Sequence, residues 1–384
     1  MNSVIRGWRY RLPVGVSLGL AAAAIVLSVW PSGAGVSPGV SGAALLSDCD
    51  GTIRQLVMHY TDEAADTVIP TYREFLRQLP AGVIVHVVCP ETRTFDNLVA
   101  AVPGTQCTLS PVIVNHPITS WSRDRWLALG TPADPRTVLW YPRGEDGAGV
   151  WPARAGDQRV ATDLAAAVRR KVLAQPADLD FDGGDFAADN ETAFVRPAIV
   201  LRNLQRTVAT RAELVARLSD VLKRRIVLFE EAPEHHTAMY LMPVGQRTVL
   251  VGDPRLAERL LAESPEKSAV DAYLPGGTDF TEATAARFDA VVAQCQAAGY
   301  RVVRIPLVPA ADGRTYITYV NAILDQRENR RIVYMPVFRC AETLNQAAAA
   351  VWSELGYEVR PVDCDACARQ FGTLHCLVNV LRRD

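Results

Sequence analysis

From about residue 53 onward, short apolar runs alternate with longer amphipathic stretches. Short runs bounded by turn residues are typical of strands, and apolar residues at three- and four-residue spacings are typical of helices. The predicted strands cover residues 53–60, 83–89, 112–115, 138–141, 226–229 and 302–307. The predicted helices cover residues 61–78, 161–174, 211–223, 282–297 and 341–355. This order predicts a mixed α/β fold.

Four pairs of predicted strands follow one another, each pair joined by a short polar turn. They are residues 127–130 with 138–141, 186–188 with 192–195, 238–244 with 248–252, and 316–324 with 331–337. A helix precedes or follows each pair, so the chain resembles a series of ββαβ units. The units share no literal sequence identity, so the repeat is one of pattern alone.

A polar group stands at the start of each strand pair. These groups are Trp121-Ser-Arg-Asp124, Asp182-Gly-Gly-Asp185, His235-His236 and, inside the first strand of its pair, Asn321. A fifth candidate, Cys376, opens a final predicted strand after a turn at Gly372. Units related by pseudosymmetry present equivalent ends to a common axis. We therefore expect the five groups to meet in one pocket.

Charge and composition narrow the possible partners. The chain has 40 Lys and Arg residues against 42 Asp and Glu residues, a formal net charge of −2. No basic run in its body suits a polyanion, so we expect no nucleic-acid partner. Residues of hydrophobic type make up 49% of the chain, enough for a large core. The oligomeric state is left open.

The N-terminal residues have a different pattern. Arg6, Arg9 and Arg11 precede an almost uncharged stretch at residues 12–30, which a Pro/Gly/Ser/Ala segment follows at 31–44. This order is typical of an export signal, and the stretch is also long enough for an uncleaved membrane anchor. We assign residues 1–46 to a signal peptide or anchor with its linker, and residues 47–384 to the folded domain. The prediction is a periplasmic or secreted protein, either free or tethered to the membrane.

Five segments occur in an order that resembles a known group of enzymes. They are Trp121-Ser-Arg-Asp124, Gly183-Gly184-Asp185, His236 with Met239-Tyr240-Leu241, Tyr319-Val-Asn321, and Gly372-Thr-Leu-His-Cys376. From about residue 53 to the C-terminus, the chain resembles the guanidino-group-modifying enzymes, especially the agmatine deiminase and bacterial peptidylarginine deiminase branch. The resemblance implies a pentein fold, a five-bladed pseudosymmetric α/β propeller. It also implies a hydrolase acting on agmatine, arginine or an arginine-containing peptide, with no cofactor and no metal.

The resemblance assigns roles that suit the chemistry of a guanidinium, which is planar, cationic and resistant to attack. Asp124 matches the carboxylate that accepts its N–H groups. Cys376 matches the nucleophile that forms a thiouronium intermediate, and His236 matches the general acid and base. Asn321 matches a polar residue of the catalytic centre.

Three further residues are candidates for substrate binding. Trp121 suits an apolar or cation–π wall, and Asp182 and Asp185 suit binding of a cation, although their segment also suits a tight turn. Adjacent strand residues face opposite sides, so only one of His235 and His236 can face inward, and we prefer His236. The same alternation predicts that His375 faces away from the pocket.

One departure from the family pattern follows His236. The branch usually has an aspartate two positions later, a second guanidinium ligand, and this chain has Ala238. Losing one charge-assisted hydrogen bond typically costs about 1.5–3 kcal/mol. The alternatives are a substitute carboxylate from Asp182, Asp185 or Glu234, a different substrate, or a binding protein for a guanidino ligand that has lost the chemistry.

The eight cysteines allow other interpretations. Export would permit disulfides, although a free Cys376 leaves at least one of the other seven unpaired. Cys364-Asp-Ala-Cys367 suggests a redox or metal protein, but a zinc site needs two further ligands. A local disulfide or two free loop thiols fits this segment better.

Overall fold

The computed structural model describes residues 40–143, 152–168 and 171–384. Backbone contacts separate Met1–Pro38 from a compact unit, Gly39–Asp384, to which all the described residues belong. Every helix among these residues is too short or too polar to cross a bilayer. The stretch at residues 12–30 lies outside them, so its assignment as a signal or anchor stays a prediction.

In the part of the chain that the structure describes, the strands form five sheets that share one connectivity. In each, a first strand pairs antiparallel with a second, which pairs parallel with a third. The first strands are β5 (Leu127–Thr131), β8 (Phe186–Ala188), β11 (Leu241–Pro243), β15 (Ile323–Arg327) and β18 (Val378–Arg383). The second strands are β6 (Asp134–Tyr141), β9 (Thr192–Val195), β12 (Thr248–Asp253), β16 (Arg330–Val337) and β2 (Ile53–His59). The third strands are β7 (Val172–Pro176), β10 (Arg225–Leu228), β13 (Arg301–Pro309), β17 (Tyr357–Asp363) and β3 (Ile84–Cys89).

Helices connect the second and third strands, because parallel neighbours need a crossover connection. In chain order these helices are α1 (Ala65–Gln78), α3 (Pro152–Ala167), α4 (Ala198–Asn203), α5 (Arg211–Leu222), α6 (Pro254–Ala262), α7 (Lys267–Tyr273), α8 (Glu282–Ala297) and α9 (Glu342–Glu354). The ββαβ units predicted from the hydrophobic pattern are therefore confirmed.

The fifth sheet uses strands from both ends of the compact unit. β18 pairs antiparallel with β2, placing Val378 opposite Met58, and β2 pairs parallel with β3. Backbone hydrogen bonds in both directions between Thr52 and Asp384 extend this pairing. A fourth strand, β4 (Thr108–Ile113), joins β3 after α2 (Thr92–Ala101). The pairing of β18 with β2 completes the series of five units.

Two short strands extend other sheets. β1 (Ala44–Leu45) pairs antiparallel with β5, and β14 (Tyr316–Thr318) pairs antiparallel with β13. β1 belongs to the segment that the sequence analysis assigned to the leader and its linker. Ordered pairing therefore begins before Ser47, where the folded domain was expected to start.

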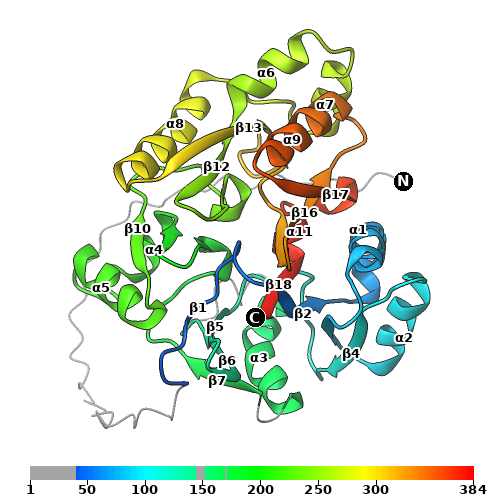
Figure 1. Cartoon of the computed structure of the whole chain (residues 1–384), viewed down its shortest axis with the longest axis vertical. Helices are drawn as coiled ribbons and strands as arrows, with labels where there is room; N and C mark the ends of the chain where they lie inside the picture. The colour runs from blue at the N-terminus through cyan, green and yellow to red at the C-terminus, as the bar shows by residue number, and fades with distance from the viewer. Residues whose placement is uncertain (1–39, 144–151, 169–170) are drawn as a thin grey trace, which may run out of the picture. The chain divides into compact units, whose positions relative to one another are not determined.

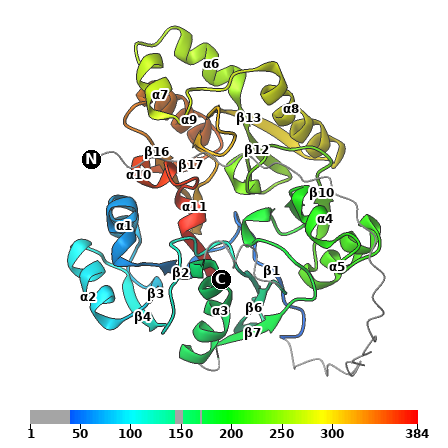
Figure 2. The same ribbon diagram turned by 180° about the vertical axis from the view of Figure 1, so that it is seen from behind.

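The helices bury one face and lie outside the strands. In α8 the buried residues Ala285, Phe288, Val291 and Cys295 recur at helical spacing, which gives one apolar stripe. Figures 1 and 2 show α5 and α8 toward the outside of the compact unit and the short helix α11 (Leu374–Leu377), with β18, in its middle. This arrangement puts the segment around Cys376 where the five units meet.

Several predicted elements need correction. The strand expected at residues 238–244 begins only at Leu241, as β11, because Thr237–Met239 form a short helical turn. The strand expected at residues 316–324 is two strands, β14 and β15, with Asn321 in the connection between them. The helix expected at residues 161–174 begins earlier, as α3, and its last residues belong to β7. The strand expected at residues 112–115 is β4, which ends at Ile113. All residues from Tyr316 to Leu324 are buried, so no alternation of polar and apolar positions marks the break.

Asn379 provides a test of the closing sheet. Its buried side chain donates to the carbonyls of Ser122 (3.2 Å) and Trp126 (3.4 Å) and accepts from the Arg123 guanidinium (3.4 Å). We expect Asn379→Ala to lower the free energy of unfolding by about 1–3 kcal/mol, because buried polar groups lose their partners. Chemical denaturation measures this change. Asn190→Ala, at an exposed position, is the control, and equal midpoints for the two variants would contradict the prediction.

Candidate active site

Each predicted polar group lies just before the first strand of its sheet. Asp124 precedes β5 and Asn321 precedes β15. Asp182 leads through the turn η2 (Gly183–Asp185) into β8, and His236 leads through η3 (Thr237–Met239) into β11. Cys376 lies in α11, which leads directly into β18. The five units thus contribute equivalent positions to one region.

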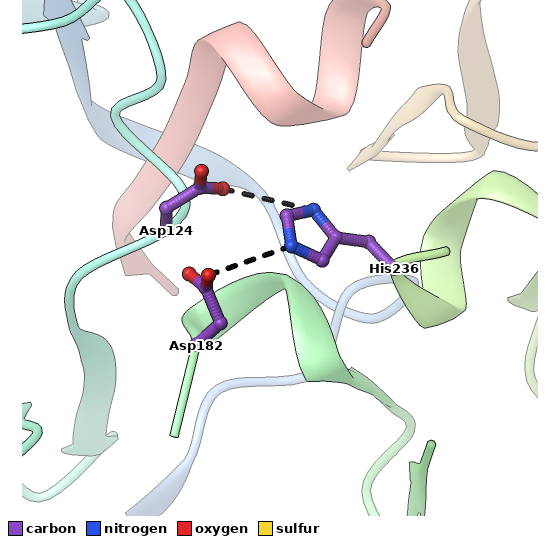
Figure 3. Close-up of side chains that lie close together, drawn as sticks. All are labelled: Asp124, Asp182 and His236. Carbon is purple, nitrogen blue, oxygen red and sulfur yellow. Dashed lines mark ion pairs between the residues drawn. The ribbon is translucent and has the colours of Figure 1, made fainter. Parts of the chain in front are cut away.

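Two aspartates and a histidine from three different units form a compact cluster. The Nδ1 atom of His236 lies 3.7 Å from Oδ1 of Asp124, and its Nε2 atom lies 3.6 Å from Oδ2 of Asp182. Figure 3 shows the imidazole with one nitrogen toward each carboxylate. Both aspartates are buried, whereas His236 retains 16% exposure of its side chain. The cluster therefore combines buried negative charge with a partly accessible imidazole.

Arg154, which the sequence analysis did not predict, joins this cluster from the first turn of α3. Its Nη1 atom lies 2.6 Å from Oδ2 of Asp124, and its Nη2 atom lies 2.9 Å from Oδ2 of Asp182. The same Nη1 atom is 4.0 Å from Oδ2 of Asp157, one helical turn further on. A single guanidinium therefore bridges two carboxylates that come from different units.

The charges in the cluster shift its pKa values. Burial lowers the pKa of His236, but Asp124 and Asp182 raise it more strongly, and contact with the Cys376 sulfur adds to the rise, so the pKa lies well above its usual value. Burial and the nearby Asp182 raise the pKa of Asp124. Burial also tends to raise the pKa of Asp182, but Arg154 and His236 lower it to well below the usual range. The two carboxylates therefore favour the protonated form of the His236 imidazole.

Two glycines let the turn before β8 approach its neighbours. A Cβ atom on Gly184 would overlap the His236 imidazole, and one on Gly183 would overlap the Arg123 carbonyl oxygen. Asp185, at the end of this turn, accepts from the Asp182 backbone N–H at 2.8 Å and pairs with Arg202 at 2.7 Å. Asp185 therefore stabilises the turn and does not join the cluster, while Asp182 does.

Cys376 lies in a helical turn, so its predicted place at the start of a strand is wrong. Its backbone N–H donates to the Thr373 carbonyl at 3.1 Å. Asn321 donates from Nδ2 to the Cys376 sulfur at 3.4 Å, and its Oδ1 atom accepts from the Thr373 hydroxyl at 2.6 Å and from the His375 N–H at 3.0 Å. Asn321 therefore holds the turn that carries the sulfur.

The Trp121 segment packs directly against this turn. A Cβ atom on Gly372 would lie 2.6 Å from the Trp121 ring and 3.2 Å from Cβ of Cys376, so the ring lies over the glycine beside the cysteine. The Arg123 N–H donates to the Cys376 carbonyl at 3.3 Å, and the Ser122 hydroxyl donates to the Leu377 carbonyl at 2.9 Å. The segment that positions Asp124 thus also fixes the backbone around Cys376.

The sequence profile of the Porphyromonas-type peptidyl-arginine deiminase family matches residues 57–380. The chain belongs to this family. It is therefore a deiminase-type hydrolase of guanidino groups, with the pentein α/β fold that the resemblance implied.

Solved structures share the fold of this chain. An agmatine deiminase from C. jejuni is 14% identical with a TM-score of 0.63, and the match covers 88% of this chain and 97% of that one. An agmatine deiminase from Enterococcus faecalis is 13% identical with a TM-score of 0.63, covering 89% of this chain and 96% of that one. No curated protein sequence matches the chain.

The other two histidines near the site have other partners. His235 accepts from the His236 backbone N–H through Nδ1 at 2.7 Å, and burial lowers its pKa well below the usual value. His375 contacts Asp48 through Nε2 at 3.1 Å, and burial lowers its pKa as well. The cluster with Asp124 therefore contains His236 and neither of the other two. His375 does face away from the cluster, as predicted, but it does so from a helical turn and not from a strand.

The position of Ala238 is apolar and almost fully buried in the largest hydrophobic cluster. Of the substitute carboxylates considered from the sequence, Asp182 contacts His236. Asp185 pairs with Arg202, and Glu234 has a largely exposed side chain that pairs with Arg287 at 3.4 Å. Asp182 therefore supplies the second carboxylate beside the imidazole.

The structure also locates the residues that could bind a metal. Within the described ranges, the group of donors close enough to do so is Asp124, Asp182 and His236, whose ligand atoms lie within 4.8 Å of one another. The Arg154 guanidinium already bonds to both carboxylates of this group, so the group suits an organic cation. Cys364 and Cys367 are buried free thiols, and the Cys367 thiol donates to the Cys364 carbonyl at 3.4 Å.

The raised pKa of His236 gives a test by NMR titration. We expect the imidazole to titrate above about pH 6.5, and Asp182→Asn to lower its pKa, because one of the charges that raise it is removed. Asp178→Asn, which removes an exposed carboxylate paired with Arg217, is the control and leaves the titration unchanged. A wild-type pKa at or below 6.5 would contradict the electrostatic picture.

The same shift predicts a pH-dependent contribution to stability. When a group has a higher pKa in the folded state than in the unfolded state, its protonation stabilises the fold. This stabilisation is complete at pH values below the unfolded pKa and is lost as the pH rises through the folded pKa. The difference in free energy of unfolding between wild type and His236→Gln should therefore be greatest below about pH 6.5 and shrink at higher pH. Denaturation series at several pH values measure this difference, and a difference that grows with pH would have the wrong sign.

Proposed function

We propose that the protein hydrolyses the guanidinium group of agmatine, free arginine or peptidyl-arginine, releasing ammonia and leaving a ureido product. One observation carries the proposal: His236 lies beside Asp124 and Asp182, which come from two other units, and the Cys376 sulfur of a further unit is near enough to raise the pKa of its imidazole. A carboxylate, an imidazolium and a thiol are the groups that this reaction needs, and family membership supports the same chemistry.

In the first half of the reaction, Asp124 and Asp182 accept N–H groups of the substrate guanidinium and orient its plane. The Cys376 sulfur, as the thiolate, attacks the central carbon of the guanidinium, forming a C–S bond and a neutral tetrahedral adduct. The imidazolium of His236 donates its proton to one nitrogen, the C–N bond breaks, and ammonia leaves. The product of this half is a thiouronium bound to Cys376.

In the second half, His236 acts as a base. The neutral imidazole takes a proton from a water molecule, whose oxygen attacks the same carbon. The C–S bond then breaks, the Cys376 sulfur leaves as the thiolate, and the hydroxyl proton passes to solvent, so a neutral ureido group remains. Asn321 donates to the Cys376 sulfur and holds its turn, so it keeps the nucleophile in place through both halves.

Two kinds of substrate are consistent with the relatives. The family profile is described as peptidyl-arginine deiminase, whereas solved relatives include agmatine deiminases, one of them from C. jejuni with its substrate bound. We propose a guanidino substrate, small or peptidyl, as the partner. We also propose that the reaction takes place outside the cytoplasm, on the basis of the export-like pattern at residues 1–46.

Offering agmatine, arginine, methylated arginine and arginine-containing peptides, with ammonia and ureido product as readouts, tests the function. We expect Cys376→Ala to lower turnover by at least about a thousandfold, because the covalent route is lost. Cys340→Ser, at a half-buried position, and Cys364→Ser, at a buried one, are controls that retain activity.

Other outcomes would contradict the proposal. Saturable binding of these compounds by folded wild-type protein without any turnover would indicate a binding protein. Activity lost in Cys364→Ser but retained in Cys376→Ala would instead indicate chemistry at the Cys364 and Cys367 thiols.

A further inference from the structure

Arg154 presents a guanidinium to the two carboxylates that the proposed substrate needs. Its two terminal nitrogens bond to Asp124 and Asp182 at 2.6 and 2.9 Å, and its side chain is 17% exposed. Such a two-pronged contact is the geometry by which carboxylates recognise a planar guanidinium. The chain therefore places one of its own arginines at the carboxylate pair of the site.

We infer that Arg154 competes with the substrate for Asp124 and Asp182 and so determines which guanidino compounds the site admits. The inference rests on the proposed function, because it assumes that the incoming ligand carries a guanidinium. A ligand must displace the Arg154 side chain, which swings away from the carboxylates by rotation about its own bonds. Arg154 thus acts on specificity and affinity, and takes no part in bond making or breaking.

The balance of charge supports displacement over shared binding. Arg154 and His236 already bring two cationic groups to the two buried carboxylates. A substrate guanidinium added to this set would place a third cation in a region of low solvent access, which is unfavourable. Removal of the Arg154 guanidinium restores the balance, because the substrate then replaces one cation with another.

Buried polar atoms without a partner show that Arg154 does not satisfy the site by itself. Within the described residues, the Oδ1 atoms of Asp124 and Asp182 and the Nδ1 atom of His236 are buried and have no hydrogen-bond partner. Arg154 uses only the Oδ2 atom of each carboxylate. Buried polar atoms of this kind normally find a partner, so the pair retains hydrogen-bonding capacity that the internal arginine does not use.

A tethered competitor has a defined effect on binding. The apparent dissociation constant equals the intrinsic one divided by the fraction of molecules whose site is free. Because Arg154 is part of the chain, its effective concentration at the carboxylates is high. Small ligands that offer a guanidinium alone are disfavoured most, and those with further contacts overcome the competition more readily.

Calorimetric binding of agmatine, arginine methyl ester and an arginine-containing peptide to the Cys376→Ala protein tests the inference without turnover. We expect Arg154→Gln in this background to lower the dissociation constant about tenfold or more. Arg154→Lys, which cannot form the two-pronged contact, should fall between the two. Arg159→Gln, at an exposed position of the same helix, is the matched control and leaves binding unchanged.

The inference fails if Arg154→Gln binds all three ligands no more tightly than its parent, or binds none of them. Circular dichroism and thermal unfolding check that each variant is folded, and Arg154→Lys preserves the test if Arg154→Gln does not fold. Turnover by variants with Cys376 intact separates the two proposals. Tighter binding without turnover supports the role of Arg154 and contradicts the hydrolase. Turnover with an unchanged KM in Arg154→Gln supports the hydrolase and contradicts the role of Arg154.

Discussion

The antiparallel pairing of β18 with β2 is the constraint on which the site depends. It joins the two ends of the compact unit in one sheet and so completes the fifth ββαβ unit. The turn that carries Cys376 leads into β18, and hydrogen bonds from Arg123 and Ser122 connect it to the segment of Asp124. Without this pairing, the sulfur would have no fixed position relative to the aspartates and the imidazole.

The second constraint is electrostatic. Two carboxylates buried close together are costly, because each is removed from water and each repels the other. His236 and Arg154 offset this cost, one from the unit of β11 and one from α3. The two carboxylates that suit a cationic substrate are therefore paired here with cationic side chains of the protein itself. Glycines at 183 and 184 allow the close approach that brings these groups together.

Local signals predicted much of this structure. The predicted helix at residues 282–297 matches α8, which Thr281 caps by accepting from the Thr284 N–H. The predicted polar turn between β8 and β9 is also present, and the Asp189 side chain accepts two backbone N–H groups there. The break before β15 and the helical turn at Cys376 were missed, because fully buried segments lack a periodic signal. Arg154 was missed for another reason: its partners Asp124 and Asp182 lie 30 and 28 positions away, so no neighbouring residue in the sequence indicates its role.

The hydrogen bonds between Thr52 and Asp384 affect the order in which the protein folds. A strand near the start of the compact unit must wait for one at its far end, so assembly involves contacts of very long sequence separation, which slow folding. A partly synthesised chain would contain the imidazole and both carboxylates without an ordered thiol beside them. The sulfur therefore reaches its place beside these groups only when the last unit has docked.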